Sequence, residues 1–278
     1  MDELAWALDQ RFAGQGIFGK DAVSPTLACL DNEPELWNST HEEVQGTVPG
    51  SSGDVIQRTI ALATALKVQF PDIQVFGPVH YGFMGLWNFQ TDASLGGDTW
   101  FTDKYLQAMK AAEEAYGRRL LDVYDFHWYS ESHGSGRVVN LSGPDLSDAD
   151  VQAIVQSPRS LWDPTFTDDS DWISHDVLHG PIRILDRLQQ KIDAGYPGTR
   201  IAITEYENGG WNHIAGTIAQ ADDLGIFGSR GVFAATFWPP GGSYDDALAG
   251  FRACRGFDGA DAMFGDTSIP ATSSDARR

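Results

Sequence analysis

Nearly continuous apolar runs alternate with amphipathic stretches along most of this chain. Short apolar runs predict buried strands, and apolar residues at helical spacing predict helices. Strands are expected at 26–31, 73–79, 121–129, 200–205 and 231–238, and helices at 54–70, 99–119, 176–194, 211–228 and 244–254. Pro181 should interrupt the third of these helices early. Five strands, each followed by a helix, predict an α/β fold with a parallel sheet that is covered on both faces.

Three segments depart from this alternation. A further helix is expected at 4–12, before the first strand. Residues 130–175 form an insertion rich in Ser, Asp and Gly, with one short helix expected at 147–155. Residues 258–278 turn to Gly, Asp, Ser and Thr, which predicts a weak strand and an irregular end. A loop as long as the insertion is often functional.

Composition narrows the classes of partner. The 278 residues include 39 acidic and 19 basic side chains, giving a formal net charge of −20. This charge argues against binding to nucleic acid or to an anionic membrane, and it suits a neutral or cationic partner. No apolar run is long enough for a membrane-spanning helix, and the first 20 residues do not have the pattern of a signal peptide. Nine Trp and eight Tyr offer flat, half-polar surfaces that suit sugar rings.

Several common chemistries have no motif in the chain. Cys29 and Cys254 lack the spacing of a metal site and are expected to be free thiols. No nucleophile elbow, phosphate-binding loop or dinucleotide-binding glycine motif is present. Four histidines lack any zinc-site spacing: His80, His133, His175 and His179. Zinc catalysis is therefore not expected, and no metal ligand set is assigned.

Two glutamates follow predicted strands directly. Glu33 follows the first strand and Glu205 ends the fourth, so both should lie at the same edge of a parallel sheet. Glycoside cleavage needs one protonated carboxyl group and one ionised carboxylate. The alternative is that each glutamate is a solvated loop acid, as most charged side chains are.

Four blocks of sequence carry a family resemblance. LDNEPELWNSTH at 30–41, DVYDFHWYSE at 122–131, ITEYENGG at 203–210 and FGDTS at 264–268 resemble glycoside hydrolase family 44, the endoglucanases and xyloglucanases of glycoside hydrolase clan A. The resemblance runs from about residue 25 to about residue 275 and implies a partial (β/α)₈ TIM barrel. Residues 1–255 would hold barrel strands four to eight, and 256–278 would begin a C-terminal β-sandwich segment with an irregular tail. The chain then resembles a fragment without strands one to three.

The resemblance also implies roles for individual residues. Glu33 matches the general acid/base and Glu205 the nucleophile of a retaining mechanism, with carboxyl groups roughly 5–5.5 Å apart. Asn32 matches the residue that hydrogen-bonds the sugar 2-hydroxyl. His127, Tyr129 and Trp238 resemble residues that line the subsite at the scissile bond.

Further residues are weaker candidates for substrate contact. Substrate contact is expected for Trp37, Tyr81 and Tyr206. For Trp37 and Tyr81, packing in the core is equally expected. The same two possibilities hold for Trp87 and Trp128. His41 could bind substrate or serve as a spacer in its loop. Glu131 and Glu207 are expected to support the site or to face solvent. Four aspartates of the insertion could hold a structural calcium ion or form a solvated acidic loop: Asp163, Asp168, Asp169 and Asp171.

The sequence thus predicts a retaining glycoside hydrolase that cleaves β-1,4-glucans such as cellulose derivatives and xyloglucan without a cofactor. Two alternatives stay open: a non-catalytic glycan-binding remnant of such a barrel, and another clan A glycosidase such as a xylanase or mannanase. The expected partner is a neutral β-glucan, with self-association through exposed barrel edges. The family resemblance implies an extracellular location.

Overall fold

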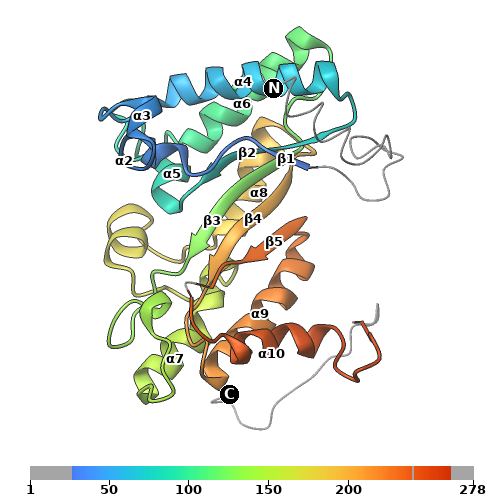
Figure 1. Ribbon diagram of the computed structural model, residues 1–278. Coiled ribbons are helices and arrows are strands. Elements are labelled where there is room, and N and C mark those ends of the chain that lie inside the picture. The colour runs from blue at the N-terminus through green and yellow to red at the C-terminus, as the bar shows by residue number, and fades with distance from the viewer. Residues whose placement is uncertain (1–26, 240, 264–278) are drawn as a thin grey trace.

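The computed structural model describes residues 27–239 and 241–263. Five parallel strands form one sheet in chain order, so that the sheet curves as half of a barrel wall (Figure 1). The strands are β1 (Leu27–Cys29), β2 (Gln74–His80), β3 (Val123–Tyr129), β4 (Arg200–Glu207) and β5 (Ala234–Phe237). Each expected strand is confirmed within a few residues, and so is the parallel α/β arrangement.

A long helix follows each strand and packs on the outer side of the sheet. These helices are α4 (Ser52–Gln69), α6 (Phe101–Tyr116), α8 (Ile184–Gly195), α9 (Ile214–Arg230) and α10 (Asp245–Cys254). Helices α4 and α6 lie together at one end of the sheet, and α9 and α10 lie at the other (Figure 1). No helix within 27–239 and 241–263 is long and apolar enough to cross a lipid bilayer.

Short helices fill the connections. They are η1 (Pro34–Leu36), α2 (Trp37–Thr40), α3 (Glu42–Gln45), α5 (Phe83–Asn88), η2 (Val138–Asn140), α7 (Asp148–Gln156), η3 (Ser157–Leu161) and η4 (Asp171–Val177). The short helix expected in the insertion is confirmed as α7, and the break at Pro181 is confirmed because η4 ends before it and α8 begins after it. The helix expected at 4–12 and the end of the tail, 264–278, lie outside the described residues.

Strand β3 separates the core from the inner face of the sheet. Tyr124, Phe126 and Trp128 point outward into the main hydrophobic core, where Phe101 and Tyr105 of α6 meet them. The residues between them, which include Asp125 and His127, therefore point inward. A small apolar layer lines the bottom of this inner face and takes one residue from each of four strands: Phe76, Val123, Ala202 and Ala234. Inward-pointing residues nearer the carboxyl ends of the strands are polar and lie above this layer.

The two outer strands of the sheet are exposed, which corrects one expectation. The run at 26–31 was expected to be a buried strand, but Leu27 is 43% exposed and Cys29 is also exposed. Among the described residues β1 has a neighbour on one side only, so half of its surface has nothing to pack against. Ala235 of β5, at the opposite edge, is exposed for the same reason. Cys29 and Cys254 are free thiols, as expected.

The exposed edge strands predict self-association of this chain. Backbone groups on the outer edges of β1 and β5, which have no partner among the described residues, can pair with a second copy, and lysines placed on an edge strand oppose such pairing. Sedimentation velocity should therefore give an average mass above 30.4 kDa that rises with protein concentration. The double variant Leu27→Lys, Ala235→Lys should shift the distribution toward the monomer. A wild-type chain that stays monomeric at every concentration and unfolds cooperatively would contradict this prediction.

Candidate active site

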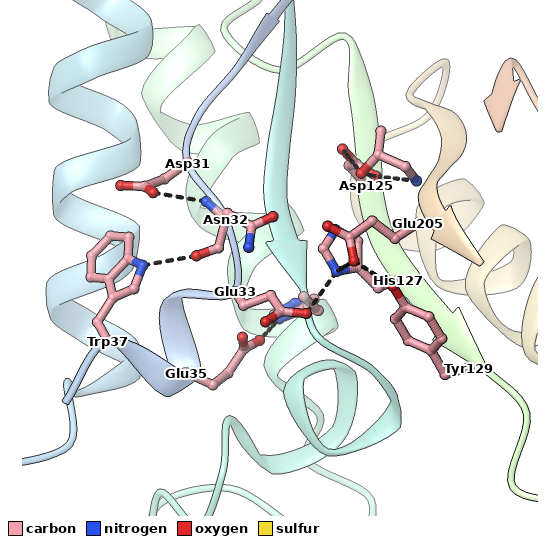
Figure 2. Close-up of polar contacts among 11 residues, drawn as sticks. Asp31, Asn32, Glu33, Glu35, Trp37, Asp125, His127, Tyr129 and Glu205 are labelled. Carbon is pink, nitrogen blue, oxygen red and sulfur yellow. Dashed lines mark hydrogen bonds and ion pairs between the residues drawn. The ribbon is translucent and has the colours of Figure 1, made fainter. Parts of the chain in front are cut away.

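Two carboxylates meet beside one buried imidazole on the inner face of the sheet (Figure 2). The His127 Nδ1 atom lies 2.8 Å from Glu33 Oε1 and 3.4 Å from Glu205 Oε2. The contributing atoms of all three side chains lie within 4.8 Å of one another. His127 is 1% exposed, whereas Glu33 and Glu205 are 22% and 18% exposed. The structure thus brings the two predicted carboxylates together, with one side of each open to solvent.

Glu33 owes its position to an unusual backbone conformation. Its φ of 46° and ψ of 58° lie in the left-handed region, and Pro34 then begins η1. Its N–H donates to the carbonyl of Val79, 2.9 Å away on β2. Val79 itself has a φ of 64° and sits where the register between β2 and β3 shifts. Non-glycine residues persist in this region only where their surroundings hold them there, and such residues are common at functional sites.

Tyr129 holds Glu205 from the other side. Its hydroxyl donates to Glu205 Oε2 over 2.5 Å. Burial of the phenol, together with the hydrogen bond and charge of Glu205, raises the pKa of Tyr129. The hydroxyl therefore keeps its proton and stays a donor, which stabilises negative charge on Glu205. His127 and Tyr129, both expected at the site, are found there.

A β-bulge in β4 decides which side chains reach the inner face. Phe126 of β3 pairs with Ile203 of β4, and the next residue of β3, His127, pairs with Glu205. Thr204 is therefore one extra residue in β4. Glu205 consequently points inward and Tyr206 points outward.

Tyr206 therefore lies in the core and not at the site, which corrects the expectation that it contacts substrate. It is 3% exposed, its ring packs against Phe227 of α9, and its hydroxyl accepts a hydrogen bond from Gln220.

A cavity of about 310 Å³ opens beside Glu33. Tyr81 and Tyr129, two of the expected substrate contacts, line it, and so do three further ionisable residues: Glu131, Arg137 and Glu207. Arg137 was not anticipated, because an arginine in a Ser- and Gly-rich insertion carries no motif. It forms an ion pair with Glu131 at 2.9 Å and donates to the carbonyl of Tyr129. The insertion thus closes one wall of the site.

Glu207 is a buried acid in this wall. It is 2% exposed and accepts hydrogen bonds from the N–H of Gly209 and from Trp211 Nε1. Burial outweighs both donors and raises its pKa to about 7. The sequence placed Glu207 near the sheet edge in a supporting or solvent-facing role, and its burial fits the supporting role.

Trp37, His41 and Trp238 do not line this cavity. Trp37 and His41 line a separate cavity of about 610 Å³, between α4 and the segment that follows β1. Trp37 Nε1 donates to the carbonyl of Asn32, an exposed residue next to Glu33. Trp238 is 55% exposed just after β5, where a sugar could reach it. Trp128 belongs to the core, with 4% of its surface exposed, and it also lines the cavity beside Glu33.

Glu35 and His80 form a buried pair that sequence reasoning missed. Glu35 is 2% exposed and forms a hydrogen bond with His80 Nδ1, while His80 Nε2 lies 3.0 Å from the hydroxyl of Tyr124. No motif marks this pair, since its members are 45 residues apart. It anchors the segment after Glu33 to the core.

Three aspartates of the insertion already accept hydrogen bonds from protein donors, Asp163 from Arg159, Asp168 from Ser132 and Asp169 from the N–H of His133, so a calcium ion there stays a prediction. Across the described ranges, the group of side chains whose spacing would suit a metal ion is Glu33, His127 and Glu205.

Comparisons with known proteins agree with the architecture. The model of glycoside hydrolase family 44 matches residues 12–132. Endoglucanase A of Paenibacillus lautus is 41% identical over 251 residues, and a β-mannanase/endoglucanase A of Caldicellulosiruptor saccharolyticus is 38% identical over 271 residues. A Paenibacillus polymyxa xyloglucanase of family 44, solved with xyloglucan, superposes with a TM-score of 0.86 at 37% identity.

The matches cover most of this chain but only part of each relative. The alignments take in 88% and 91% of this chain and 35% and 20% of the two named enzymes. The superposition takes in 99% of this chain and 53% of the xyloglucanase. The five strands therefore correspond to part of the catalytic barrel of this family.

The raised pKa of Glu207 predicts a pH-dependent cost to stability. The folded chain binds the proton of Glu207 more tightly than the unfolded chain does. The folded chain therefore loses stability as the pH rises through the folded pKa of about 7. Glu207→Gln removes this titration, so the variant should gain about 2 kcal/mol of unfolding free energy relative to wild type between pH 5 and pH 8. Urea denaturation at both pH values measures the difference.

Glu114→Gln, on the exposed side of α6, provides the matched control for this measurement. Its difference from wild type should not change between the two pH values. The same lack of change for Glu207→Gln would show that burial of Glu207 does not perturb its titration.

Proposed function

Because the chain belongs to glycoside hydrolase family 44, we propose that it cleaves β-1,4-glucan-type polysaccharides, such as xyloglucan and cellulose derivatives, with retention of configuration. The observation that carries this proposal is the approach of Glu33 and Glu205 to within 4.8 Å on the inner face of the sheet. Retaining glycosidases hold their two carboxyl groups about 5–5.5 Å apart, whereas inverting enzymes leave about 6.5–9.5 Å for a water molecule.

In the proposed mechanism the two glutamates have different roles. Glu205 attacks the anomeric carbon while Glu33 protonates the departing glycosidic oxygen. Glu33 then removes a proton from water, which attacks the covalent sugar and releases Glu205. The hydroxyl of Tyr129 on Glu205 suits a group that must begin and end the cycle as a carboxylate. His127 spaces the two carboxylates and fixes their directions.

The surroundings of the pair suit an uncharged glucan. Tyr81 and Tyr129 line the cavity beside Glu33, and the exposed ring of Trp238 could stack on a neighbouring sugar. Exposed Asn32 precedes Glu33, where it could reach a sugar hydroxyl. A net charge of −20 would repel an anionic polymer but not a neutral one. The xyloglucanase that was solved with xyloglucan supports the same substrate class.

One specific observation favours a second candidate. The Caldicellulosiruptor relative carries both β-mannanase and endoglucanase in its name, so mannan is a substrate to test alongside glucans, with xylan as a third. A non-catalytic, glycan-binding role is the alternative from another class, because aromatic side chains can bind sugars without turnover.

Three further properties belong to this proposal. The two-carboxylate mechanism needs no cofactor, so activity should survive a chelator.

The enzyme would act outside the cell, since its polymeric substrate cannot cross a membrane, and activity in a culture supernatant would test this. Residues 256–278 would begin an accessory β segment, for which the described part offers one bridge between Arg255 and Met263.

Hydrolysis by the wild-type chain, with binding measured in parallel, tests the function. Reducing sugars should appear from xyloglucan and from an uncharged cellulose derivative such as hydroxyethyl-cellulose, and NMR of the first product should show retained β configuration. A chain that binds xyloglucan without hydrolysing it would support the non-catalytic alternative. Hydrolysis of mannan or xylan in preference to glucans would assign the chain to the other glycosidases.

Substitution of each glutamate separates their roles. Glu33→Gln should lower kcat/KM on polysaccharide by about 10²–10⁴-fold, and by much less on an aryl glycoside whose leaving group needs no proton. Glu205→Gln should abolish turnover of both substrates, because no nucleophile is left. Glu114→Gln should leave both rates unchanged. A chain that is inactivated by Glu33→Gln but unaffected by Glu205→Gln would refute these roles.

A further inference from the structure

The orientation of Glu205 depends on one extra residue in β4. Ile201 and Ile203 both face the helices, two residues apart, but the next residue to do so is Tyr206, three positions later. The register with β5 shifts at the same point, because Ile203 pairs with Ala235 and Tyr206 with Phe237. The extra residue thus belongs to β4 and is not accommodated by either neighbouring strand.

Asp125 binds this extra residue from the middle of β3. Its Oδ1 accepts the N–H of Thr204 at 3.2 Å and the hydroxyl of Thr204 at 2.8 Å, and its Oδ2 lies 2.9 Å from the same hydroxyl. The thiol of Cys29 also donates to Oδ2, at 3.3 Å. The backbone N–H that a bulge removes from the ladder has therefore gained a side-chain acceptor.

We propose that Asp125 is a positioning residue that holds the bulge at Thr204 and thereby turns Glu205 toward the inner face. Without its carboxylate, the regular register would place Thr204 opposite His127. Glu205 would then point outward and Tyr206 inward, since a slip of one residue exchanges the two faces of a strand. This inference rests on the proposed nucleophilic role of Glu205, but the register that it predicts can be measured without any activity.

Burying a carboxylate at this position costs more free energy than burying an apolar side chain of similar size. Asp125 is fully buried, and within the described part of the chain no lysine or arginine is among its hydrogen-bond partners. Burial raises its pKa to about 6 despite the donors that surround it. A leucine of similar size would pack at lower cost but could not accept the N–H of Thr204. A requirement for an acceptor at this position explains the aspartate.

The test compares variants of Asp125 in the full 278-residue chain. Trapping of Glu205 by an activated 2-deoxy-2-fluoro-cellobioside, followed by mass spectrometry, reports the position of the nucleophile. Asp125→Leu should slow trapping by more than about 10²-fold, because a displacement of only about 1 Å can already cost that much and Glu205 would turn to the other face of the strand. Asp125→Asn keeps an oxygen for Thr204 and should slow it by less than about tenfold.

Nitration of Tyr206, mapped by peptide mass, measures the register independently of activity. Tyr206 should be protected in the wild type and in Asp125→Asn, and reactive in Asp125→Leu. Deletion of Thr204 in the Asp125→Leu background removes the extra residue, so Glu205 should again face inward. Trapping should recover at least tenfold and Tyr206 should be protected again, which a general loss of stability could not produce.

Asp150→Leu is the matched control. Asp150 is also buried and accepts one serine hydroxyl and two backbone N–H groups, but it lies in α7, outside the sheet. This variant should lose stability, yet trap at close to the wild-type rate with Tyr206 protected. If Asp125→Leu fails to fold, Thr204→Val, which loses only the hydroxyl bonds, should still slow trapping by several-fold.

The outcomes separate the two claims. A folded Asp125→Leu variant with protected Tyr206, or a Thr204→Val variant that traps at the wild-type rate when Asp125→Leu is unfolded, would overturn the positioning role. A wild-type chain that does not trap the reagent would overturn the proposed function. In that case nitration of Tyr206 in Asp125→Leu and in its deletion partner still decides the role of Asp125.

Discussion

Two carboxylates that are brought within 4.8 Å of each other repel when both are charged, and the inner face of this half-barrel has to oppose that repulsion. Coulomb's law with an effective dielectric constant of about 20 gives about 3 kcal/mol at this separation. His127 Nδ1 lies between Glu33 and Glu205, and the hydroxyl of Tyr129 adds a donor to Glu205. His127 and Tyr129 both belong to β3. The positions of Glu33 and Glu205 relative to them therefore depend on the registers of the strands that flank β3.

Those registers shift in both strands that flank β3. Val79 is the extra residue of β2, and its carbonyl accepts the N–H of Glu33. Thr204 is the extra residue of β4, and Glu205 follows it directly. Each carboxylate is therefore tied to a bulge, one through a hydrogen bond and the other through the chain itself. A regular sheet would present neither group in this way, because bulges redirect side chains that strict alternation would fix.

The sequence predicted what depends on strand order and missed what depends on register. Glu33 and Glu205 could be placed at one edge because parallel strands end together, and the resemblance supplied His127 and Tyr129. Tyr206 was misplaced because one extra residue in β4 inverts every later side chain, and no residue type marks such an insertion. Asp125 passed unnoticed within an apolar strand, although it shares a face with His127 and Tyr129 at a spacing of two. The exposure of β1 was missed because an apolar run does not reveal how many neighbours a strand has.

The acids of the inner face set a limit on how stable this sheet can be near neutral pH. Burial raises the pKa of Asp125 to about 6 and that of Glu207 to about 7, so ionisation of either group favours the unfolded chain as the pH rises. Their partners are hydroxyls, amides, a thiol and an indole, and none of these donors carries a full charge. Stability must then come from the other face of the sheet, where aromatic side chains of β3 and α6 pack without exposure. Alternation along the strands thus separates two functions. Outward side chains stabilise the fold, whereas the inward acidic side chains lower its stability and serve the proposed active site.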